Sequence, residues 1–170
     1  LPFDPPRLVA LEAAFAATNR CPICADIDDA GARIVATGAG LVAWCPAVPP
    51  LSGAVRVAPV AHQPDWAAAL DAGALGRMLR HQARRNADVS GNDALNLWLN
   101  QRRPGGMDRF HWHVDLLPRT EALAGLELGA GVAALTQTPD ASAARLRALG
   151  IRPNGTSAFH RMAPAACLAT

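Results

Sequence analysis

The sequence predicts a single domain of the α+β class, built on an antiparallel sheet. Its 170 residues are enough for one hydrophobic core, and 51% hydrophobic against 18% charged residues is an ordinary globular composition. Short segments with the period-two alternation of strands are interspersed with segments that repeat apolar residues at helical spacing. Neither an internal repeat nor a domain boundary is visible. We therefore expect residues 1–150 to form one domain and residues 151–170, which lack periodicity, to form an irregular tail.

Six segments carry strand patterns. They comprise residues 33–36, 41–44, 54–60, 94–100, 109–117 and 125–132. The first two flank a glycine-containing turn and predict a β-hairpin. Pro59 is expected to end the third strand, because proline donates no hydrogen bond to a ladder. The fourth alternates cleanly between leucines on one face and Asn96, Trp98 and Asn100 on the other, and the sixth is expected to be a bent strand at the sheet's edge.

Three segments carry helical spacing. They are residues 5–19, which open with a proline pair, residues 65–86 and residues 140–149. In the longest of them Leu70, Leu75 and Leu79 share one side. The opposite side is expected to be solvated, and it carries four arginines: Arg77, Arg80, Arg84 and Arg85. The last helix is expected to be capped near Pro139-Asp140. Its inward residues are expected to be Leu146 and Leu149.

The stretch from Arg109 to Leu117 is the most informative in the chain. If it is a strand, side chains alternate between its faces. His111, His113 and Asp115 then share one face. Phe110, Trp112 and Val114 share the other. Two imidazoles and a carboxylate at this spacing can bind a metal or attack a phosphorus atom, whereas the aromatic and apolar face is suited to the core.

Cysteine and histidine residues predict a metal site. Cys21 and Cys24 stand in a Cys-x-x-Cys sequence, expected to be a tight turn, and offer two thiolates, while His62 follows a strand and His111 opens the motif above. Together they make the Cys₂His₂ set that holds structural zinc in tetrahedral geometry. A thiol redox pair is the alternative, although no thioredoxin-like pattern surrounds it. Cys45 is expected to be a buried small hydrophobe.

His113 is the predicted nucleophile. With His111 committed to zinc, its neighbour on the same face is left to attack an α-phosphorus and form a nucleotidyl-histidine. The phosphate oxygens need donors, and the backbone amides of Gly105 and Gly106 together with Arg109 are candidates for this. Alternatively, His113 is a structural histidine or a second metal ligand, and the glycines belong to a plain hairpin loop.

Charge and hydropathy exclude several classes of partner. The net charge is only +2, and all 16 basic residues are arginine, so nothing predicts nucleic-acid binding. No run of about 18 apolar residues is present, so no membrane span is expected. The first residues lack the order of a signal peptide, and a Cys-x-x-Cys pair suits a reducing compartment. We therefore expect a cytoplasmic protein that does not bind membranes.

The same residues resemble a known family. The Cys-x-x-Cys motif, the strand before His62, residues 96–100, the Phe110-His111-Trp112-His113 sequence and residues 116–119 resemble the galactose-1-phosphate uridylyltransferase branch of the histidine-triad superfamily. Residues 124–132 and 143–147 look most like the carboxy-terminal half of its members. This resemblance implies a histidine-triad-like half-barrel of antiparallel strands with flanking helices, a structural zinc ion and, as in many relatives, a homodimer.

The resemblance also implies residue roles. His111 would ligate zinc with Cys21, Cys24 and His62. His113 would be the nucleophile and Asn100 a nucleotide contact. Asp115 completes the predicted catalytic pair with His113. Relatives have Gln or a third His at this position. An ionised carboxylate beside a phosphate is repelled unless it is protonated or meets a cation, so Asp115 decides whether this stretch is an active site, a redesigned one or a retired one.

These observations predict a nucleotidyltransferase, phosphorylase or hydrolase that acts on a nucleoside diphosphate sugar or a dinucleotide. A second hypothesis is a zinc-stabilised domain without catalysis, which binds a nucleotide or joins a partner half. A third treats His111, His113 and Asp115 as a two-histidine, one-carboxylate iron site. The third leaves the Cys-x-x-Cys pair without a role.

Overall fold

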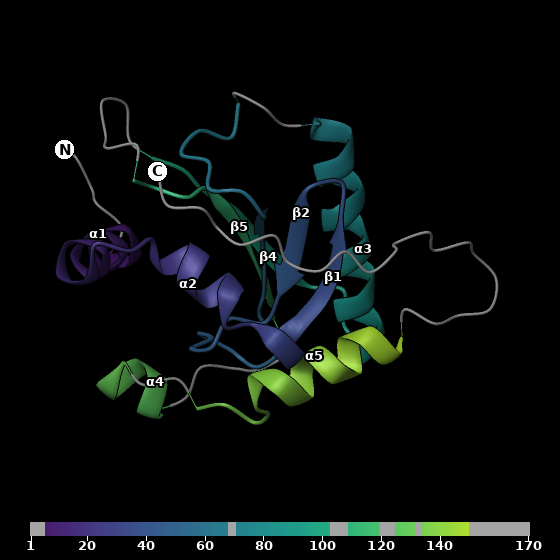
Figure 1. Ribbon diagram of the computed structural model, residues 1–170. Coiled ribbons are helices and arrows are strands. Elements are labelled where there is room, and N and C mark those ends of the chain that lie inside the picture. The colour runs from purple at the N-terminus through teal and green to yellow at the C-terminus, as the bar shows by residue number, and fades with distance from the viewer. Residues whose placement is uncertain (1–5, 68–70, 103–108, 120–124, 132–133, 150–170) are drawn as a thin grey trace.

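A five-stranded antiparallel sheet with flanking helices forms the fold, which confirms the predicted α+β class (Figure 1). The computed structural model describes residues 6–67, 71–102, 109–119, 125–131 and 134–149. Its helices are α1 (Pro6–Thr18), α2 (Pro22–Asp28), the 3-10 turn η1 (Gly31–Arg33), α3 (Ala72–Ser90), α4 (Gly125–Ala130) and α5 (Pro139–Ala148). Its strands are β1 (Ile34–Gly38), β2 (Leu41–Trp44), β3 (Val55–Pro59), β4 (Leu95–Asn100) and β5 (His113–Pro118).

The strands lie in the order β1-β2-β3-β5-β4. β1 and β2 form the predicted hairpin, whose turn places Gly40 at a φ of 74° in the left-handed region. The last of the described strands, β5, is inserted between β3 and β4, with Arg56 opposite Asp115 on one side and Asn100 opposite His113 on the other. The strand order therefore places the predicted motif on an inner strand of the sheet, between β3 and β4.

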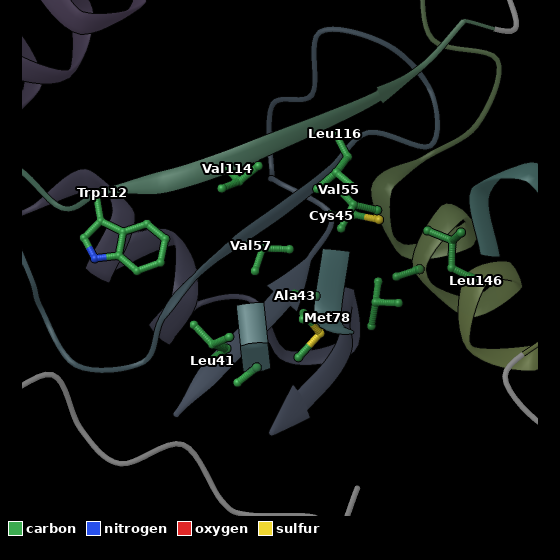
Figure 2. Close-up of a cluster of buried hydrophobic side chains, with 13 residues drawn as sticks. Leu41, Ala43, Cys45, Val55, Val57, Met78, Trp112, Val114, Leu116 and Leu146 are labelled. Carbon is green, nitrogen blue, oxygen red and sulfur yellow. The ribbon is translucent and has the colours of Figure 1, made fainter. Parts of the chain in front are cut away.

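One face of the sheet carries the main hydrophobic core (Figure 2). The inward residues of four strands pack there against α3 and α5. They include Val35, Leu41, Ala43, Val55, Val57, Val114 and Leu116 from the sheet and Met78 and Leu146 from the helices. Trp112 is fully buried in the same cluster, and Cys45 is buried beside it, as predicted for a small hydrophobe. Leu146 is inward as expected, and Leu149 is half-buried.

The opposite face is covered by α2. Trp44, Val42 and Ala58 from the strands pack there against Ile23 and Ile27 of α2 in a smaller apolar cluster that also contains the Cys-x-x-Cys residues. The sheet is thus buried on both faces over β2 and β3, and the smaller cluster carries the polar groups described below.

Several predicted boundaries are wrong for identifiable reasons. The long helix begins at Ala72 rather than residue 65, because the side chain of Asp71 accepts a hydrogen bond from the amide of Ala74 and caps it. Leu70 lies outside the described residues. The last helix is capped by Thr138, whose hydroxyl accepts from the amide of Ala141, rather than by the predicted Pro139-Asp140.

Two predicted conformations also differ. The Cys-x-x-Cys segment is the first turn of α2 and not a tight turn, because Pro22 fits the first position of a helix. Residues 125–130 form helix α4 and not an edge strand; a short run of small and apolar residues does not distinguish the two by periodicity. Residues 132–133 and the tail predicted for residues 151–170 lie outside the described part.

The predicted strand 109–117 begins only at His113, because the amide of Trp112 donates to the carbonyl of Gln63 in the loop after β3. The side chains still alternate as predicted. Trp112 and Val114 enter the core, while His111, His113 and Asp115 lie on the other face.

Candidate functional site

Four side chains converge in the arrangement predicted for zinc. The ligand atoms of Cys21, Cys24, His62 and His111 all lie within 4.8 Å of one another. The Sγ atom of Cys24 is 3.4 Å from the Nδ1 atom of each histidine. A tetrahedral zinc ion with ordinary bond lengths would set sulfur and nitrogen ligands about 3.5 Å apart, so the donor set fits the ion in both type and spacing.

A backbone carbonyl fixes the orientation and the tautomer of the His111 ring in this cluster. Its Nε2–H donates to the carbonyl of Pro59 at 3.1 Å, so the lone pair is on Nδ1, the atom that faces Cys24. Such an outer hydrogen bond orients a metal-ligating imidazole and sets its tautomer. The ring of His62 meets that of His111 edge-on, with centroids 5.0 Å apart. The site thus ties the first turn of α2 to the loop after β3 and to the chain entering β5.

The two thiols favour a metal over a redox pair. Both are buried and neither is in a disulfide. The hydrogen bond with Cys24 holds the pKa of Cys21 well below its ordinary value; burial acts in the opposite direction, and contacts with His111 and His62 lower the pKa further. Thiolate is the form that binds zinc, and histidine nitrogens complete the set.

His113 has its Nε2 atom free of a proton. Its Nδ1–H donates to the backbone carbonyl of His111 at 3.0 Å, which leaves the lone pair on Nε2. The side chain is only 2% exposed, and burial, reinforced by the positive charge of Arg56, lowers its pKa to about 4 although Asp115 acts in the opposite direction. The imidazole is therefore neutral near pH 7. The ring of Phe110 stacks on it at a centroid distance of 6.1 Å.

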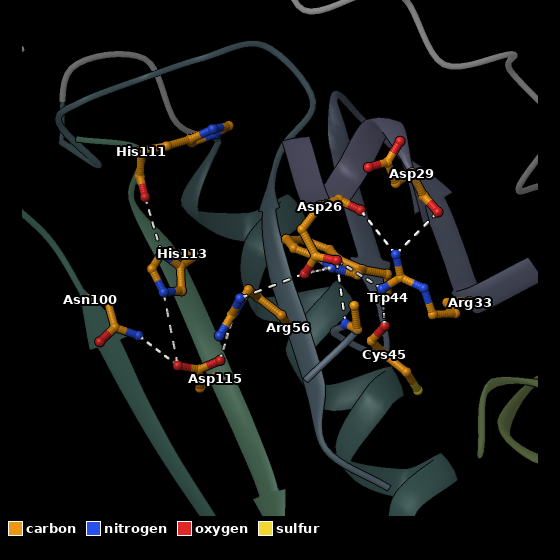
Figure 3. A network of polar contacts seen from close by, with 11 residues as sticks. Asp26, Asp29, Arg33, Trp44, Cys45, Arg56, Asn100, His111, His113 and Asp115 are labelled. Carbon is orange, nitrogen blue, oxygen red and sulfur yellow. Dashed lines mark hydrogen bonds and ion pairs between the residues drawn. The ribbon is translucent and has the colours of Figure 1, made fainter. Parts of the chain in front are cut away.

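Asp115 is paired with a cation, Arg56, which the sequence analysis did not predict. Its Oδ1 atom accepts from Nε of Arg56 at 2.9 Å, and its Oδ2 atom accepts from the amide of Asn100 at 2.9 Å (Figure 3). The same Oδ2 lies 3.9 Å from Nε2 of His113. Asp115 is buried, so its charge is neutralised by a partner directly across the ladder rather than by solvent.

The network continues away from His113. Arg56 reaches a carboxylate oxygen of Asp26 at 3.8 Å, and Asp26 also accepts from Arg33 at 2.8 Å and from the indole of Trp44 at 2.9 Å. Reasoning from the sequence missed Arg56 and Asp26. The available signal was Arg56 itself, the single charge in the 54–60 strand, on the face opposite Val55 and Val57.

The remaining predicted phosphate ligands are not assembled around His113 in the described chain. Gly105 and Gly106 lie outside the described residues. Arg109 is exposed, and its guanidinium lies 4.9 Å from the ring centroid of Phe15 in α1. Asn100 alone joins the site, through Asp115.

Comparisons with known proteins identify the fold. No protein-family model matches the sequence, and a search of curated proteins finds no match. Among solved structures, a uridylyltransferase matches with a TM-score of 0.76 at 24% identity, over 87% of this chain and 52% of the other. An ADP-glucose phosphorylase from Arabidopsis thaliana, with bound ADP-glucose, gives 0.74 at 20% identity, over 86% and 50%. A Hit-like protein from Bartonella henselae gives 0.51 at 17%, over 68% and 85%.

These matches confirm at the level of the fold the predicted resemblance to the uridylyltransferase branch of the histidine-triad superfamily. The chain spans about half the length of the uridylyltransferase and of the phosphorylase. Which half it corresponds to stays a prediction. Residues 124–132 and 143–147 resemble the carboxy-terminal half. The Cys₂His₂ cluster and the histidine that follows it are instead features that the same resemblance assigns to catalytic halves.

Proposed function

We propose that this chain is a nucleotidyltransferase, phosphorylase or hydrolase that acts on a nucleoside diphosphate sugar or a dinucleotide, with His113 as the nucleophile. The observation that carries the proposal is the hydrogen bond from Nδ1 of His113 to the carbonyl of His111, because it leaves Nε2 unprotonated in a fixed orientation. The fold shared with a uridylyltransferase and an ADP-glucose phosphorylase supports a nucleotide sugar as the substrate.

The reaction would proceed in two displacements. Nε2 of His113 attacks the α-phosphorus, a phosphorus–nitrogen bond forms, and the bond to the bridging oxygen breaks, so that a sugar phosphate or a nucleotide leaves with the electron pair. A second nucleophile then attacks the same phosphorus and releases His113. A sugar phosphate in this role makes the protein a transferase, inorganic phosphate makes it a phosphorylase, and water makes it a hydrolase.

Asp115, held by Asn100 and Arg56, would lie beside the reacting imidazole, which its own hydrogen bond to the carbonyl of His111 orients. The carboxylate lies 3.9 Å from Nε2, and its hydrogen bonds to Arg56 and Asn100 hold it in place. Because Arg56 compensates its charge, Asp115 repels a substrate phosphate less than an unpaired carboxylate would. Gly105, Gly106 and Arg109 remain the proposed donors to the phosphate oxygens.

Zinc would have a structural role. Cys21, Cys24, His62 and His111 would hold it, and it would supply a fixed junction between α2, the loop after β3 and the start of β5. The hydrogen bond that Nδ1–H of His113 donates to the carbonyl of His111 then connects this junction to the proposed nucleophile.

Trapping the intermediate tests the function. The protein is incubated with UDP-glucose or ADP-glucose labelled at the α-phosphate and quenched at alkaline pH. Label should remain on the protein and be released by mild acid. His113→Ala should abolish labelling while keeping its zinc content, and His81→Ala, a histidine of α3 on the opposite side of the sheet, should leave labelling unchanged. Equal labelling of His113→Ala, or loss of its zinc, would remove the nucleophile assignment.

A zinc-stabilised domain without catalysis is the second candidate. One observation favours it, namely the 2% exposure of His113. It predicts neither label nor turnover with any nucleotide in the same experiment, although nucleotide binding itself remains. The iron alternative is disfavoured by geometry, because His111 directs Nδ1 to Cys24 and the oxygens of Asp115 are held by Arg56 and Asn100.

We also propose that the chain forms a homodimer through β4. This strand is the last in the sheet order, and two of its leucines are uncovered, Leu97 at 48% and Leu99 at 37% exposure. An apolar edge of this kind is a ready surface for a second copy. In the described part of the chain, no helix combines the length and the apolar character that crossing a bilayer requires.

A further inference from the structure

On the side of the sheet that carries His113, part of the surface is accessible. Helix α2 packs on this side over apolar residues of β2 and β3. Strand β4, which ends the sheet, has no buried residue: Asn96 is exposed, and Trp98 and Asn100 are half-buried. The strand next to the one that carries His113 therefore offers accessible side chains to a substrate.

The register of β4 places an aromatic side chain close to the proposed nucleophile. Trp98 is directly opposite Asp115, and Asn100 is directly opposite His113. Opposed residues of an antiparallel pair point to the same side of the sheet, with Cβ atoms about 4.5–5.5 Å apart. The hydrogen bond from the amide of Asn100 to Oδ2 of Asp115 confirms this shared side (Figure 3). Trp98 is thus displaced from the position of His113 by two residues, about 7 Å along the strand.

The row formed by Asn96, Trp98 and Asn100 has the chemistry that a sugar ring requires. An indole offers a large flat apolar surface, and each side-chain amide offers two donors and an acceptor. A pyranose has apolar C–H faces and a rim of hydroxyl groups, which can both donate and accept. None of the three side chains is charged, so the row suits an uncharged part of a substrate better than a phosphate group.

We propose that Trp98 is the platform for the sugar ring of the substrate, and that Asn96 takes part in selecting the sugar. This inference rests on the function proposed for His113. With the α-phosphorus at Nε2 of His113, the sugar phosphate extends along β4, where its ring stacks on the indole and its hydroxyl groups meet the amide of Asn96. A nucleobase can also stack on an indole, but it has no rim of hydroxyl groups, and the experiment separates the two.

Calorimetric titration of the full chain tests the proposal without any turnover. The probes are glucose 1-phosphate, uridine monophosphate and inorganic phosphate at equal ionic strength. Trp98→Ala should weaken the binding of glucose 1-phosphate about tenfold, because an aromatic contact is lost, and should leave the other two affinities unchanged. Trp98→Phe keeps a flat ring and should recover most of the loss. Leu97→Ala, the neighbouring residue on the opposite side of β4, is the matched control and should bind all three probes like the parent.

The choice of sugar gives a second measurement. Asn96→Ala should change the ratio of the affinities for glucose 1-phosphate and its C4 epimer galactose 1-phosphate, because hydrogen bonds to hydroxyl groups are lost. Leu97→Ala should keep this ratio. An unchanged ratio in Asn96→Ala would remove that residue from the proposal.

Three results would overturn the role of Trp98. They are no saturable binding of glucose 1-phosphate by the parent, an equal loss for all three probes in Trp98→Ala, which would assign the indole to the fold, and a loss for uridine monophosphate alone, which would assign it to the nucleobase. Trapping of label on His113 is a separate readout. Label without any effect of Trp98→Ala would overturn only the sugar platform, whereas sugar binding that depends on Trp98 without label would overturn only the nucleophile.

Discussion

The two faces of the same sheet bury side chains of very different kinds. On the face covered by α3 and α5, β5 contributes Val114 and Leu116 to an apolar core. On the face covered by α2, the same strand contributes His113 and Asp115, which are equally buried. Alternation along one strand thus separates stability from chemistry by a single residue.

The difference teaches how each face tolerates burial. Apolar side chains need only close packing, whereas a buried charge needs a partner, because its desolvation is otherwise uncompensated. The polar face meets this need in two ways: Arg56 pairs with Asp115, and the Cys₂His₂ cluster offers a complete ligand set to a metal. On this face, the stability lost in a substitution should therefore depend on whether the remaining polar group keeps a partner. On the other face, it should depend on the side-chain volume that is removed.

Removing a zinc ligand should have the largest effect. Cys21→Ser should lose zinc and folded structure together, because the binding free energy of a structural zinc ion, on the order of 10 kcal/mol, is also folding free energy. Metal analysis and circular dichroism measure both. Cys45→Ala, a buried cysteine on the apolar face, is the matched control and should keep one zinc ion per chain. A folded Cys21→Ser protein without metal would show that the cluster does not hold this fold together.

Breaking the ion pair should cost less. Asp115→Ala leaves the partly buried Arg56 without its closest partner, and such a change in a fully buried pair costs about 3–5 kcal/mol. The low end is expected, because Asp26 still lies 3.8 Å from Arg56. Leu116→Ala, the next residue along β5 and on the other face, should cost about 2–5 kcal/mol through lost burial and a cavity. Urea unfolding at pH 7 measures both.

The double variant distinguishes the two faces. Replacing both partners, Arg56→Met with Asp115→Leu, removes both charges at similar volume and should recover most of the stability lost in Asp115→Ala. If the double variant is no more stable than Asp115→Ala, the ion pair with Arg56 is not what compensates the cost of burying Asp115.

Local patterns predicted the sheet well. The hairpin of β1 and β2, the strands β3 and β4 and the division of His111, His113 and Asp115 from Trp112 and Val114 follow from period-two alternation, which the structure confirms. The convergence of the Cys-x-x-Cys pair with two distant histidines was also predicted, because these residue types share one chemistry. Helix α4 was not, since six small and apolar residues carry no distinguishing period.

Local sequence patterns could not predict the contacts that depend on strand order. Arg56 meets Asp115 only because β5 is inserted beside β3, and no period in the sequence encodes that neighbour. Single residues without a motif become informative once their neighbours are known.

The effect expected to be smallest near neutral pH concerns Cys45, on the apolar face. Burial raises the pKa of its thiol from 9.0 to about 12. Between these values the unfolded chain loses this proton and the native protein keeps it, so the free energy of unfolding should fall by about 1.4 kcal/mol per pH unit from pH 9 to pH 12. The sequence contains no Lys and no Tyr, so few other side chains titrate in this window. Urea unfolding at several pH values measures the slope. Cys45→Ala should be less stable near pH 7 because of the space it leaves, yet lose less stability as the pH rises. An equal slope in both proteins would mean that the thiol is not protected by the core, and that the apolar face admits water where its cysteine lies.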